Sequence, residues 1–295
     1  KPIERRQKMS KRDVYQEITD GIIEQLESGT VPWVKPWTTV EGESTFPTNR
    51  YTGKSYRGAN IPALWCAGIR EGYASNMWLS YKQARNVGGH VRKGETGTPI
   101  IFVKFNKVQD RDDSTKSRSI PFVKYSTVFN VEQVDDLPTL DNVEQEWNQI
   151  ADVDSLITTT GAAITHGGDR AFYMPEPDRI NMPHKASFSD SGNYYATLLH
   201  ELTHWTGSKT RLNRLYGSRF GDEAYAREEL VAEMGAAFLC AHCGIDGQLQ
   251  HAEYLASWIK VLKSDKRAIV QAASAAQKAA DFVTGFTYAE VTEAA

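Results

Sequence analysis

The stretch Ala196-Thr-Leu-Leu-His200-Glu201-Leu-Thr-His204 has the spacing His-Glu-x-x-His within an apolar run. No helix-breaking residue interrupts 194–206, so the pattern predicts a helix. Residues four apart share one helical face, and the two imidazoles can therefore take adjacent corners of a tetrahedral zinc site, at roughly 2.0–2.1 Å from the ion. Glu201 follows the first ligand, where its carboxylate would reach a water molecule beside the metal and act as the general base.

A second predicted helix supplies the third ligand. It reads Arg227-Glu228-Glu229-Leu-Val-Ala-Glu233-Met-Gly-Ala-Ala-Phe-Leu. Glu229 and Glu233 are four apart, so we predict that Glu229 binds the metal and that Glu233 holds the outer nitrogen of a ligating histidine. Glu228 is the alternative third ligand. The five-residue pattern also occurs in ordinary helices, but the second helix and the apolar flanks, which would bury polar side chains that need partners, favour a metal site.

The ligand set indicates one divalent metal ion as cofactor. Two imidazoles and a carboxylate are a typical catalytic zinc set, so zinc is the expected ion. Manganese and cobalt fit the same geometry, because metal supply as well as affinity decides occupancy. A peptidase also needs a group that stabilises the oxyanion, and the candidates are Tyr216, Tyr225 and the arginines of the basic loop after the first helix.

Length and composition indicate a globular chain. It has 295 residues, enough for two domains, with hydrophobic and aromatic contents of 40% and 11%. No apolar run approaches about 18 residues, so no membrane span is expected. Residues 1–9 are charged without a following apolar segment, which argues against a secretory signal. Three cysteines indicate a reducing compartment, and we expect a cytoplasmic protein with buried thiols, since Cys240-Ala-His-Cys243 has no second pair to complete a zinc site.

The net charge of −3 hides an asymmetry along the chain. Residues 1–131 contain 21 Lys and Arg against 13 Asp and Glu, whereas the rest contains 13 against 24. An acidic linker at 134–140 separates the two parts. We therefore predict an α+β protein with a small, mixed α/β nucleic-acid-binding domain at 1–135 and a metal-dependent peptidase domain at 136–295.

Aromatic and basic residues are interleaved in the first part. Residues 31–107 hold 11 bases and 4 acids among many tryptophans and tyrosines. Flat rings stack on unpaired bases and cations neutralise phosphates, which favours single-stranded DNA over duplex. The alternative is that the tryptophans are core residues and the bases a solvated face, and it applies to Trp65 and Trp78, which lie in apolar patterns. The predicted DNA contacts are Trp33, Lys35, Trp37, Arg50, Tyr51, Lys54, Tyr56 and Arg57.

Apolar periodicity predicts the remaining elements. Helices are expected at 10–28, 61–70, 78–87, 142–160 and 253–282, strands at 98–108, 121–131 and 163–166, and a hairpin turn at 51–56. Ile180-Asn-Met182 precedes the metal helix, and we predict it as the exposed edge strand that pairs with an extended substrate.

Two segments together resemble a known family. Tyr51-Thr-Gly-Lys-Ser-Tyr-Arg-Gly-Ala-Asn60 and His200-Glu-Leu-Thr-His-Trp-Thr-Gly207, the latter followed by Arg211-Leu-Asn-Arg214, resemble the ArdC antirestriction proteins of conjugative plasmids, which are similar to the N-terminal part of TraC-type primases. The resemblance covers nearly the whole chain. It implies a single-stranded-DNA-binding domain fused to a zincin-like, gluzincin-like metallopeptidase domain that protects incoming plasmid DNA from host restriction during conjugation. The residues it implies are the ligands His200, His204 and Glu229 and the catalytic Glu201.

The residues and the family resemblance together leave three functional hypotheses. The first is an antirestriction protein that binds single-stranded DNA and carries a peptidase site, with restriction-system components as candidate protein substrates and no membrane partner. The second is a non-enzymatic protein that coats single-stranded DNA and has a structural metal. The third, a DNA hydrolase, ranks last, because nucleases usually cluster carboxylates around paired metals. Replacing Glu201 by Ala separates the first two.

Overall fold

The computed structural model describes residues 13–33, 45–109, 117–139, 149–214, 223–246 and 254–285, with the backbone alone at 103–109, 117–122 and 149–152. The described chain is α+β, as predicted. Its helices and strands are α1 Val14–Glu27, β1 Thr48–Asn49, α2 Asn60–Glu71, β2 Met77–Ser80, α3 Tyr81–Asn86, β3 His90–Val91, β4 Thr98–Gln109, β5 Ser117–Asn130, β6 Val134–Asp135, α4 Gln149–Thr160, β7 Ala163–His166, β8 Phe172–Met174, β9 Arg179–Met182, α5 Ser191–Thr206, α6 Glu223–Cys243, α7 Leu255–Ser264 and α8 Ala268–Thr284.

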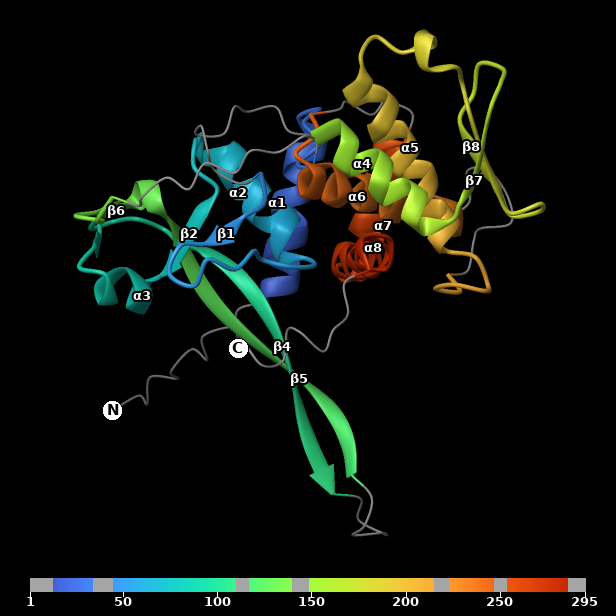
Figure 1. The fold of residues 1–295 in the computed structure, drawn as a ribbon. Helices are drawn as coiled ribbons and strands as arrows, with labels where there is room; N and C mark the ends of the chain where they lie inside the picture. Colours follow the sequence, from blue (N-terminus) through green and yellow to red (C-terminus); the bar gives the residue numbers. More distant parts are fainter. Residues whose placement is uncertain are drawn as a thin grey trace, which may run out of the picture.

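The N-terminal part is built on a four-stranded sheet in the order β1-β2-β5-β4. The predicted strands at 98–108 and 121–131 are confirmed as β4 and β5, which pair along their whole length and form a hairpin that extends away from the body of the molecule (Figure 1). Helices α1 and α2 pack on each other and on β4. Asp13 caps α1 by accepting a hydrogen bond from the backbone N–H of Gln16, which explains where this helix begins.

The helix predicted at 78–87 is wrong in its first part. Trp78 and Leu79 lie in β2, and α3 begins at Tyr81. The start of α3 is fixed by a capping box, in which Ser80 and Gln83 each accept from the other's backbone N–H. Trp78 and Leu79 are fully buried in a strand that has neighbours on both sides. A short apolar run of this kind fits a buried strand as well as a helix, so periodicity alone does not separate them.

The C-terminal part surrounds the predicted metal helix. α5 lies against α6 and α8, and a three-stranded sheet in the order β7-β9-β8 lies beside it (Figure 1). The prediction that Ile180-Asn-Met182 forms an exposed edge is wrong. These residues belong to β9, which pairs with β7 on one side and β8 on the other, and both Ile180 and Met182 are fully buried. Alternation shows which side chains face the core, but it does not show which strand is central.

The single helix predicted at 253–282 is two helices, α7 and α8. The chain turns at Asp265, which has an extended backbone and accepts a hydrogen bond from the N–H of Arg267. The Thr19 hydroxyl of α1 donates to the carbonyl of Lys266 in this turn, and Lys266 forms an ion pair with Asp13. The turn is therefore stabilised by contacts with a distant helix. None of the described helices combines the length and the apolar character that crossing a membrane requires.

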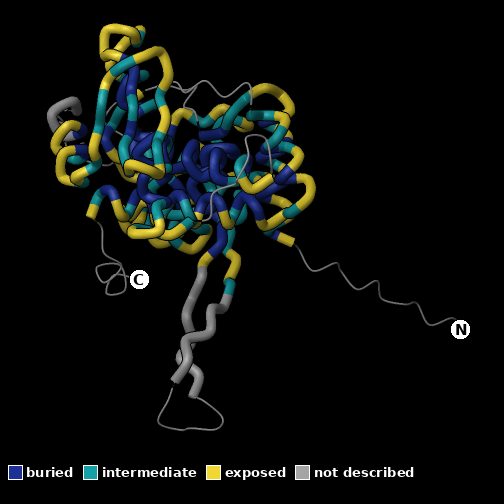
Figure 2. The backbone as a smooth tube through the Cα atoms, turned by 90° about the vertical axis from the view of Figure 1, so that its right-hand side faces the viewer, coloured by how far each residue is buried: buried dark blue, intermediate teal, exposed yellow. Residues whose placement is uncertain are grey.

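One hydrophobic core crosses the predicted boundary between the domains. Trp33 packs edge-on against Trp258 of α7, and Trp65 of α2 lies against Phe238 of α6. These four residues belong to the same cluster of packed side chains. Figure 2 shows buried residues gathered in the middle of the molecule, with exposed residues around them. The N-terminal and C-terminal parts thus pack as one body.

Candidate metal centre

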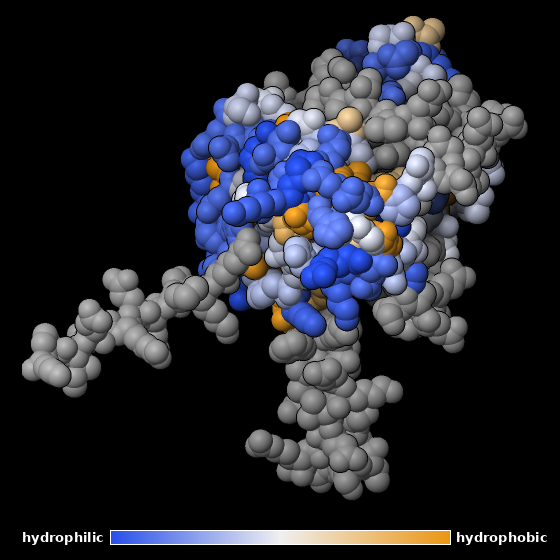
Figure 3. Space-filling model, turned by 90° about the vertical axis from the view of Figure 1, so that its left-hand side faces the viewer, coloured by the Kyte–Doolittle hydropathy of each residue, from blue (hydrophilic) through white to orange (hydrophobic). Residues whose placement is uncertain are grey.

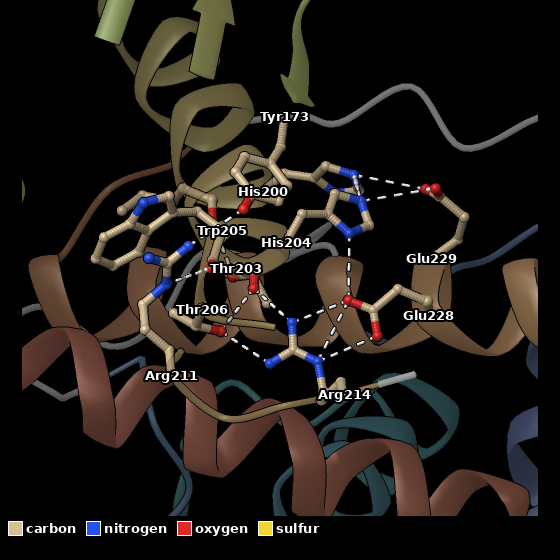
Figure 4. A network of polar contacts seen from close by, with 11 residues as sticks. Tyr173, His200, Thr203, His204, Trp205, Thr206, Arg211, Arg214, Glu228 and Glu229 are labelled. Carbon is tan, nitrogen blue, oxygen red and sulfur yellow. Dashed lines mark hydrogen bonds and ion pairs between the residues drawn. The ribbon is translucent and has the colours of Figure 1, made fainter. Parts of the chain in front are cut away.

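The helix α5 brings the two histidines together. Asp190 caps its first turn by accepting from the backbone N–H of Asn193, and the helix continues to Thr206. The Nε2 atoms of His200 and His204 lie 3.2 Å apart. Glu229 of α6 approaches both, with its two oxygens at 3.6 Å from the Nε2 of His200 and 3.6 Å from that of His204 (Figure 4). The three predicted ligands therefore converge on one point.

The spacing of these atoms fits a divalent ion. A tetrahedral site with bonds of roughly 2.0–2.2 Å has ligand–ligand edges of about 3.3–3.6 Å. The 3.2 Å between the two Nε2 atoms is close to one edge of such a tetrahedron, and each Glu229 oxygen lies 3.6 Å from one of the two nitrogens. Glu229 is only 5% exposed, and a buried carboxylate is costly unless a positive charge compensates it. Within the described chain, these three residues form a group suited to hold a metal ion.

A glycine allows the two metal-binding helices to approach. A Cβ at Gly235 of α6 would lie 2.5 Å from the Cγ2 of Thr203 and 2.7 Å from its Oγ1. Thr203 belongs to α5, one residue before His204, and is fully buried. No larger side chain fits at 235 unless the helices move apart. The reach of Glu229 to the histidines therefore depends on this close contact.

The outer nitrogens of the histidines each face a further carboxylate. The Nδ1 of His204 lies 3.3 Å from Glu228, and the Nδ1 of His200 lies 3.5 Å from Glu233. A carboxylate at Nδ1 favours the tautomer with its proton there, which leaves the Nε2 lone pair for the metal. Glu233 thus faces the outer nitrogen of His200, and its role in holding that ring stays a prediction. Glu228, the alternative ligand, faces the outer nitrogen of a histidine instead.

The electrostatics of the site favour positive charge between the ligands. Burial lowers the pKa of His204, but its hydrogen bonds to Glu228 and Glu229 outweigh burial and raise the pKa to about 10. The pKa of His200 is also raised, with burial again opposed by the neighbouring carboxylates. Burial raises the pKa of Glu229, but its hydrogen bonds to the histidines hold it well below the usual value. Protons and a metal ion therefore compete for the same nitrogens.

Glu201 lies on α5 beside the first ligand and is 7% exposed. It does not belong to the group of three ligands. It is therefore a fourth buried carboxylate of the site, beside Glu228, Glu229 and Glu233, and its role in proton transfer stays a prediction.

The loop after α5 is fixed by two arginines. Arg211 stacks on Trp205 at 3.8 Å and forms two hydrogen bonds with Asp178, at 2.6 and 2.9 Å. Its guanidinium also donates to the hydroxyl of Tyr173, a β8 residue that points toward α5 (Figure 4). Arg214 binds Glu228. Sequence reasoning missed Asp178 and Tyr173, because no local pattern connects the turn after β8 with this loop.

The candidates for oxyanion stabilisation are only partly described. Tyr216 lies outside the described residues. The Tyr225 hydroxyl is 3.4 Å from that of Tyr254. Burial, this hydrogen bond and the nearby negative charge of Glu229 raise the pKa of Tyr225, so its hydroxyl stays protonated and can donate.

The predicted DNA contacts divide into core and surface residues. Trp33 and Tyr56 are 4% and 8% exposed, so their rings belong to the core, as the alternative interpretation of the aromatics allows. Arg57 forms an ion pair with Asp281 of α8 at 2.6 Å. Tyr51 is 49% exposed, in the turn that Arg50 and Lys54 also occupy. Lys35 and Trp37 lie outside the described residues.

Comparison with known proteins agrees with this arrangement. Residues 151–275 match the zincin-like metallopeptidase family and residues 12–129 match the N-terminal domain of anti-restriction factor ArdC. Together with the His200, His204 and Glu229 site, the match defines an α+β protein with a zincin-like metallopeptidase domain.

Crystal structures of the antirestriction ArdC protein from the R388 plasmid, one metal-free and one Mn(II)-bound, are 41% and 40% identical to the chain, each with a TM-score of 0.77. Each match covers 93% of this chain and 98% of that one. The chain therefore belongs to the ArdC family of antirestriction proteins, as the resemblance in its sequence predicts.

Other relatives are longer or uncharacterized. Two DNA primases TraC from Escherichia coli are 40% and 41% identical over 96% of this chain, which spans only 28% and 20% of their length. The uncharacterized protein y4eC of Sinorhizobium fredii (strain NBRC 101917 / NGR234) is 38% identical over 92% of this chain and 91% of its own.

Proposed function

We propose that the chain is an antirestriction protein whose C-terminal part hydrolyses peptide bonds with a divalent metal and whose N-terminal part binds single-stranded DNA. The observation that carries the peptidase proposal is the convergence of His200, His204 and Glu229, with the buried Glu201 beside them. Zinc is the proposed native ion and manganese the alternative, and the Mn(II)-bound ArdC structure supports a divalent ion in either case. Three buried cysteine thiols are compatible with the reducing cytoplasm.

The proposed chemistry assigns a role to each carboxylate. His200, His204 and Glu229 would hold the ion, which when bound polarises a peptide carbonyl and lowers the pKa of water. Glu201 would take a proton from the attacking water and deliver it to the leaving amine. Burial of the site restricts competing solvent around these groups. Tyr225 is a candidate donor to the developing oxyanion.

The peptidase proposal is tested by Glu201→Gln and Glu201→Ala. Both variants should keep the metal content of the wild type and lose about 10²- to 10⁴-fold in hydrolysis, the usual contribution of a general base. The substrates to offer are purified restriction-enzyme subunits and unfolded casein. Absence of cleavage of every substrate by the metal-loaded wild type would count against a peptidase. If Glu201→Ala still protects plasmid DNA from restriction, the non-enzymatic coating function is favoured instead.

The DNA proposal rests on a surface formed by two segments without acidic residues. Residues 49–57 and 80–93 hold seven Lys and Arg and no Asp or Glu. The side-chain amide of Asn49 donates to that of Gln83 at 3.1 Å, so the turn after β1 lies beside α3. Tyr51 and Tyr81 are 49% and 54% exposed on these two elements. The side of the molecule on which α3 lies is largely hydrophilic (Figure 3).

Exposed tyrosines with basic neighbours suit single strands, because rings stack on free bases and cations contact phosphates. Tyr81→Ala should weaken binding of a short oligonucleotide by about 1–3 kcal/mol, the usual value of one stacked base. Lys82→Gln and Arg85→Gln should each make the fall of log affinity with log salt concentration less steep, by about 0.7 in the slope. Lys260→Gln, at an exposed position of α7, is the matched control. If all four variants bind the oligonucleotide with equal affinity, this surface is excluded as the DNA-binding site.

A further inference from the structure

We infer that Arg214 is a positioning residue of the metal centre, which acts on the ligand His204 through Glu228. The inference rests on the metal site of the proposed function and does not depend on which substrate the site cleaves.

The guanidinium of Arg214 holds the Glu228 carboxylate in a bidentate contact. Its Nη2 lies 2.9 Å from Oε1 and its Nε 3.1 Å from Oε2 (Figure 4). The same Oε1 lies 3.3 Å from the Nδ1 of His204. Arg214 and Glu228 side chains are 12% and 6% exposed, so water competes little for these contacts. A two-point contact fixes the plane of the carboxylate as well as its place.

Arg214 is itself fixed to the helix that bears His204. Its Nη1 donates to the hydroxyl of Thr206 at 2.8 Å and its Nη2 to the carbonyl of Thr203 at 2.5 Å. Both acceptors belong to the last turn of α5, where backbone carbonyls lack helical partners. One guanidinium therefore joins the end of α5 to Glu228 of α6. The carboxylate at the Nδ1 of His204 and the end of the helix that bears His204 are thus held by the same side chain.

This arrangement has two consequences for the metal. The carboxylate of Glu228 holds the His204 ring by its Nδ1–H, which aims Nε2 at the point that Glu229 also faces. The bidentate contact also keeps Glu228 away from that point, so that only one of two adjacent carboxylates serves as a ligand. Arg214 thus gives a structural reason for the distinction between Glu228 and Glu229, which the sequence draws only from the spacing of Glu229 and Glu233.

A matched control lies three residues earlier. Arg211 belongs to the same loop and is also largely buried, with a side chain 10% exposed. Its guanidinium binds Asp178 and stacks on Trp205 rather than contacting a carboxylate that faces a metal ligand. Arg211→Gln therefore weakens the anchoring of the loop without removing the partner of His204.

The experiment measures metal affinity in the full chain, without reference to catalysis. The wild type, Arg214→Gln, Glu228→Gln, their double variant, Arg214→Lys and Arg211→Gln are stripped of metal. Zn²⁺ affinity is then measured by competition with a chromophoric chelator, and the absorption spectrum of bound Co²⁺ reports the ligand geometry. Circular dichroism in the presence of chelator shows which variants are folded.

We expect Arg214→Gln and Glu228→Gln each to weaken Zn²⁺ binding by about 10- to 100-fold and to change the Co²⁺ spectrum. The double variant should lose no more Zn²⁺ affinity than the weaker-binding single variant, because both substitutions act through one contact. Arg214→Lys should recover part of the loss, since it keeps the charge but not the bidentate geometry. Arg211→Gln should retain wild-type affinity and spectrum.

Three results would overturn the inference: wild-type affinity in Arg214→Gln, additive losses in the double variant, or an equal loss in Arg211→Gln. If Arg214→Gln fails to fold, the Glu228→Gln variant provides the test, because it leaves the contacts of Arg214 with α5 in place. Wild-type Zn²⁺ affinity in Glu228→Gln would also overturn the inference. Failure to find a peptide substrate would count against the proposed function alone, since none of these readouts requires turnover.

Discussion

At the scale of single residues, the site is distinguished by four buried glutamates that the fold gives different partners. Glu201, Glu228, Glu229 and Glu233 are between 2% and 7% exposed. Burying this many carboxylates is strongly unfavourable unless cations or hydrogen-bond donors compensate them. Arg214 compensates Glu228, and the histidines together with a divalent ion would compensate the others. The number of acids in the site thus agrees with a metal centre and disagrees with an ordinary core.

The cysteines give a prediction at the same scale. All three are buried thiols, as the sequence predicts, and burial raises the pKa of Cys66 to about 12. Because the thiolate is the reactive form, alkylation of Cys66 by iodoacetamide at pH 8 should be slowed by about a thousandfold or more relative to the unfolded chain. Mass spectrometry of native and urea-denatured samples measures this. Rapid labelling of native Cys66 would show that the α1–α2 contact opens readily.

At the scale of elements, the site depends on how closely α5 and α6 pack. The ligands come from both helices, and Gly235 lies against Thr203 at the point of contact. The interface between the two helices is close-packed and has no room for an added methyl group, so such a group must displace one helix. The metal site is therefore sensitive to a substitution that removes no ligand.

Gly235→Ala tests this dependence. Overpacking should destabilise the protein by about 1–3 kcal/mol and weaken metal binding, because Glu229 moves away from the histidines. Thr203→Ala removes the atoms that the new Cβ would meet at 2.5 and 2.7 Å, so the double variant should regain part of both losses. Chemical denaturation and Zn²⁺ titration measure the two effects. Full metal affinity in Gly235→Ala alone would contradict the account.

The elements also show what the sequence can and cannot predict. His200, His204 and Glu229 are predictable because helical spacing is local, and one face of a helix needs no tertiary information. The spacing to Glu233 favours Glu229 over Glu228, but the physical reason for their different roles, where α6 crosses α5 and what Arg214 binds, lies in the tertiary structure. The same limit explains the errors at β9 and at the 265–267 turn. The 265–267 turn depends on Asp13 and Thr19, which are distant in sequence, whereas the central place of β9 depends on how it pairs with β7 and β8.

At the scale of the whole molecule, the two parts predicted from the charge asymmetry share one core. Trp33 and Trp258 pack together, and Arg57 binds Asp281 across the same interface. The backbone N–H of Gly58 also donates to Gln277 of α8 at 2.9 Å. The charge pattern predicts surfaces well, because charges are solvated, but it carries no information on whether two regions bury apolar side chains against each other. Trp33 shows this most clearly, because its place in a basic segment suggested a DNA contact at the surface, whereas its ring is buried in the shared core.

A shared core predicts joint unfolding. Denaturant unfolding followed by tryptophan fluorescence and by circular dichroism should give coincident transitions. Trp258→Ala, which opens the interface, should lower the unfolding free energy by about 3–5 kcal/mol for both probes together. Lys260→Gln, exposed on the same helix, should leave the transition within about 0.5 kcal/mol of wild type. Two separate transitions in the wild type would contradict a single packed body.

The central claim, that His200, His204 and Glu229 hold one divalent ion, is tested most directly by metal content. Wild type, His204→Ala and His90→Ala are expressed and dialysed side by side, and metal per chain is measured by inductively coupled plasma mass spectrometry; His90 is an exposed histidine outside the site. We predict close to one equivalent of zinc or manganese in wild type and His90→Ala, and a large loss in His204→Ala. An equal metal content in all three proteins, or none in the wild type after incubation with either ion, would contradict the account.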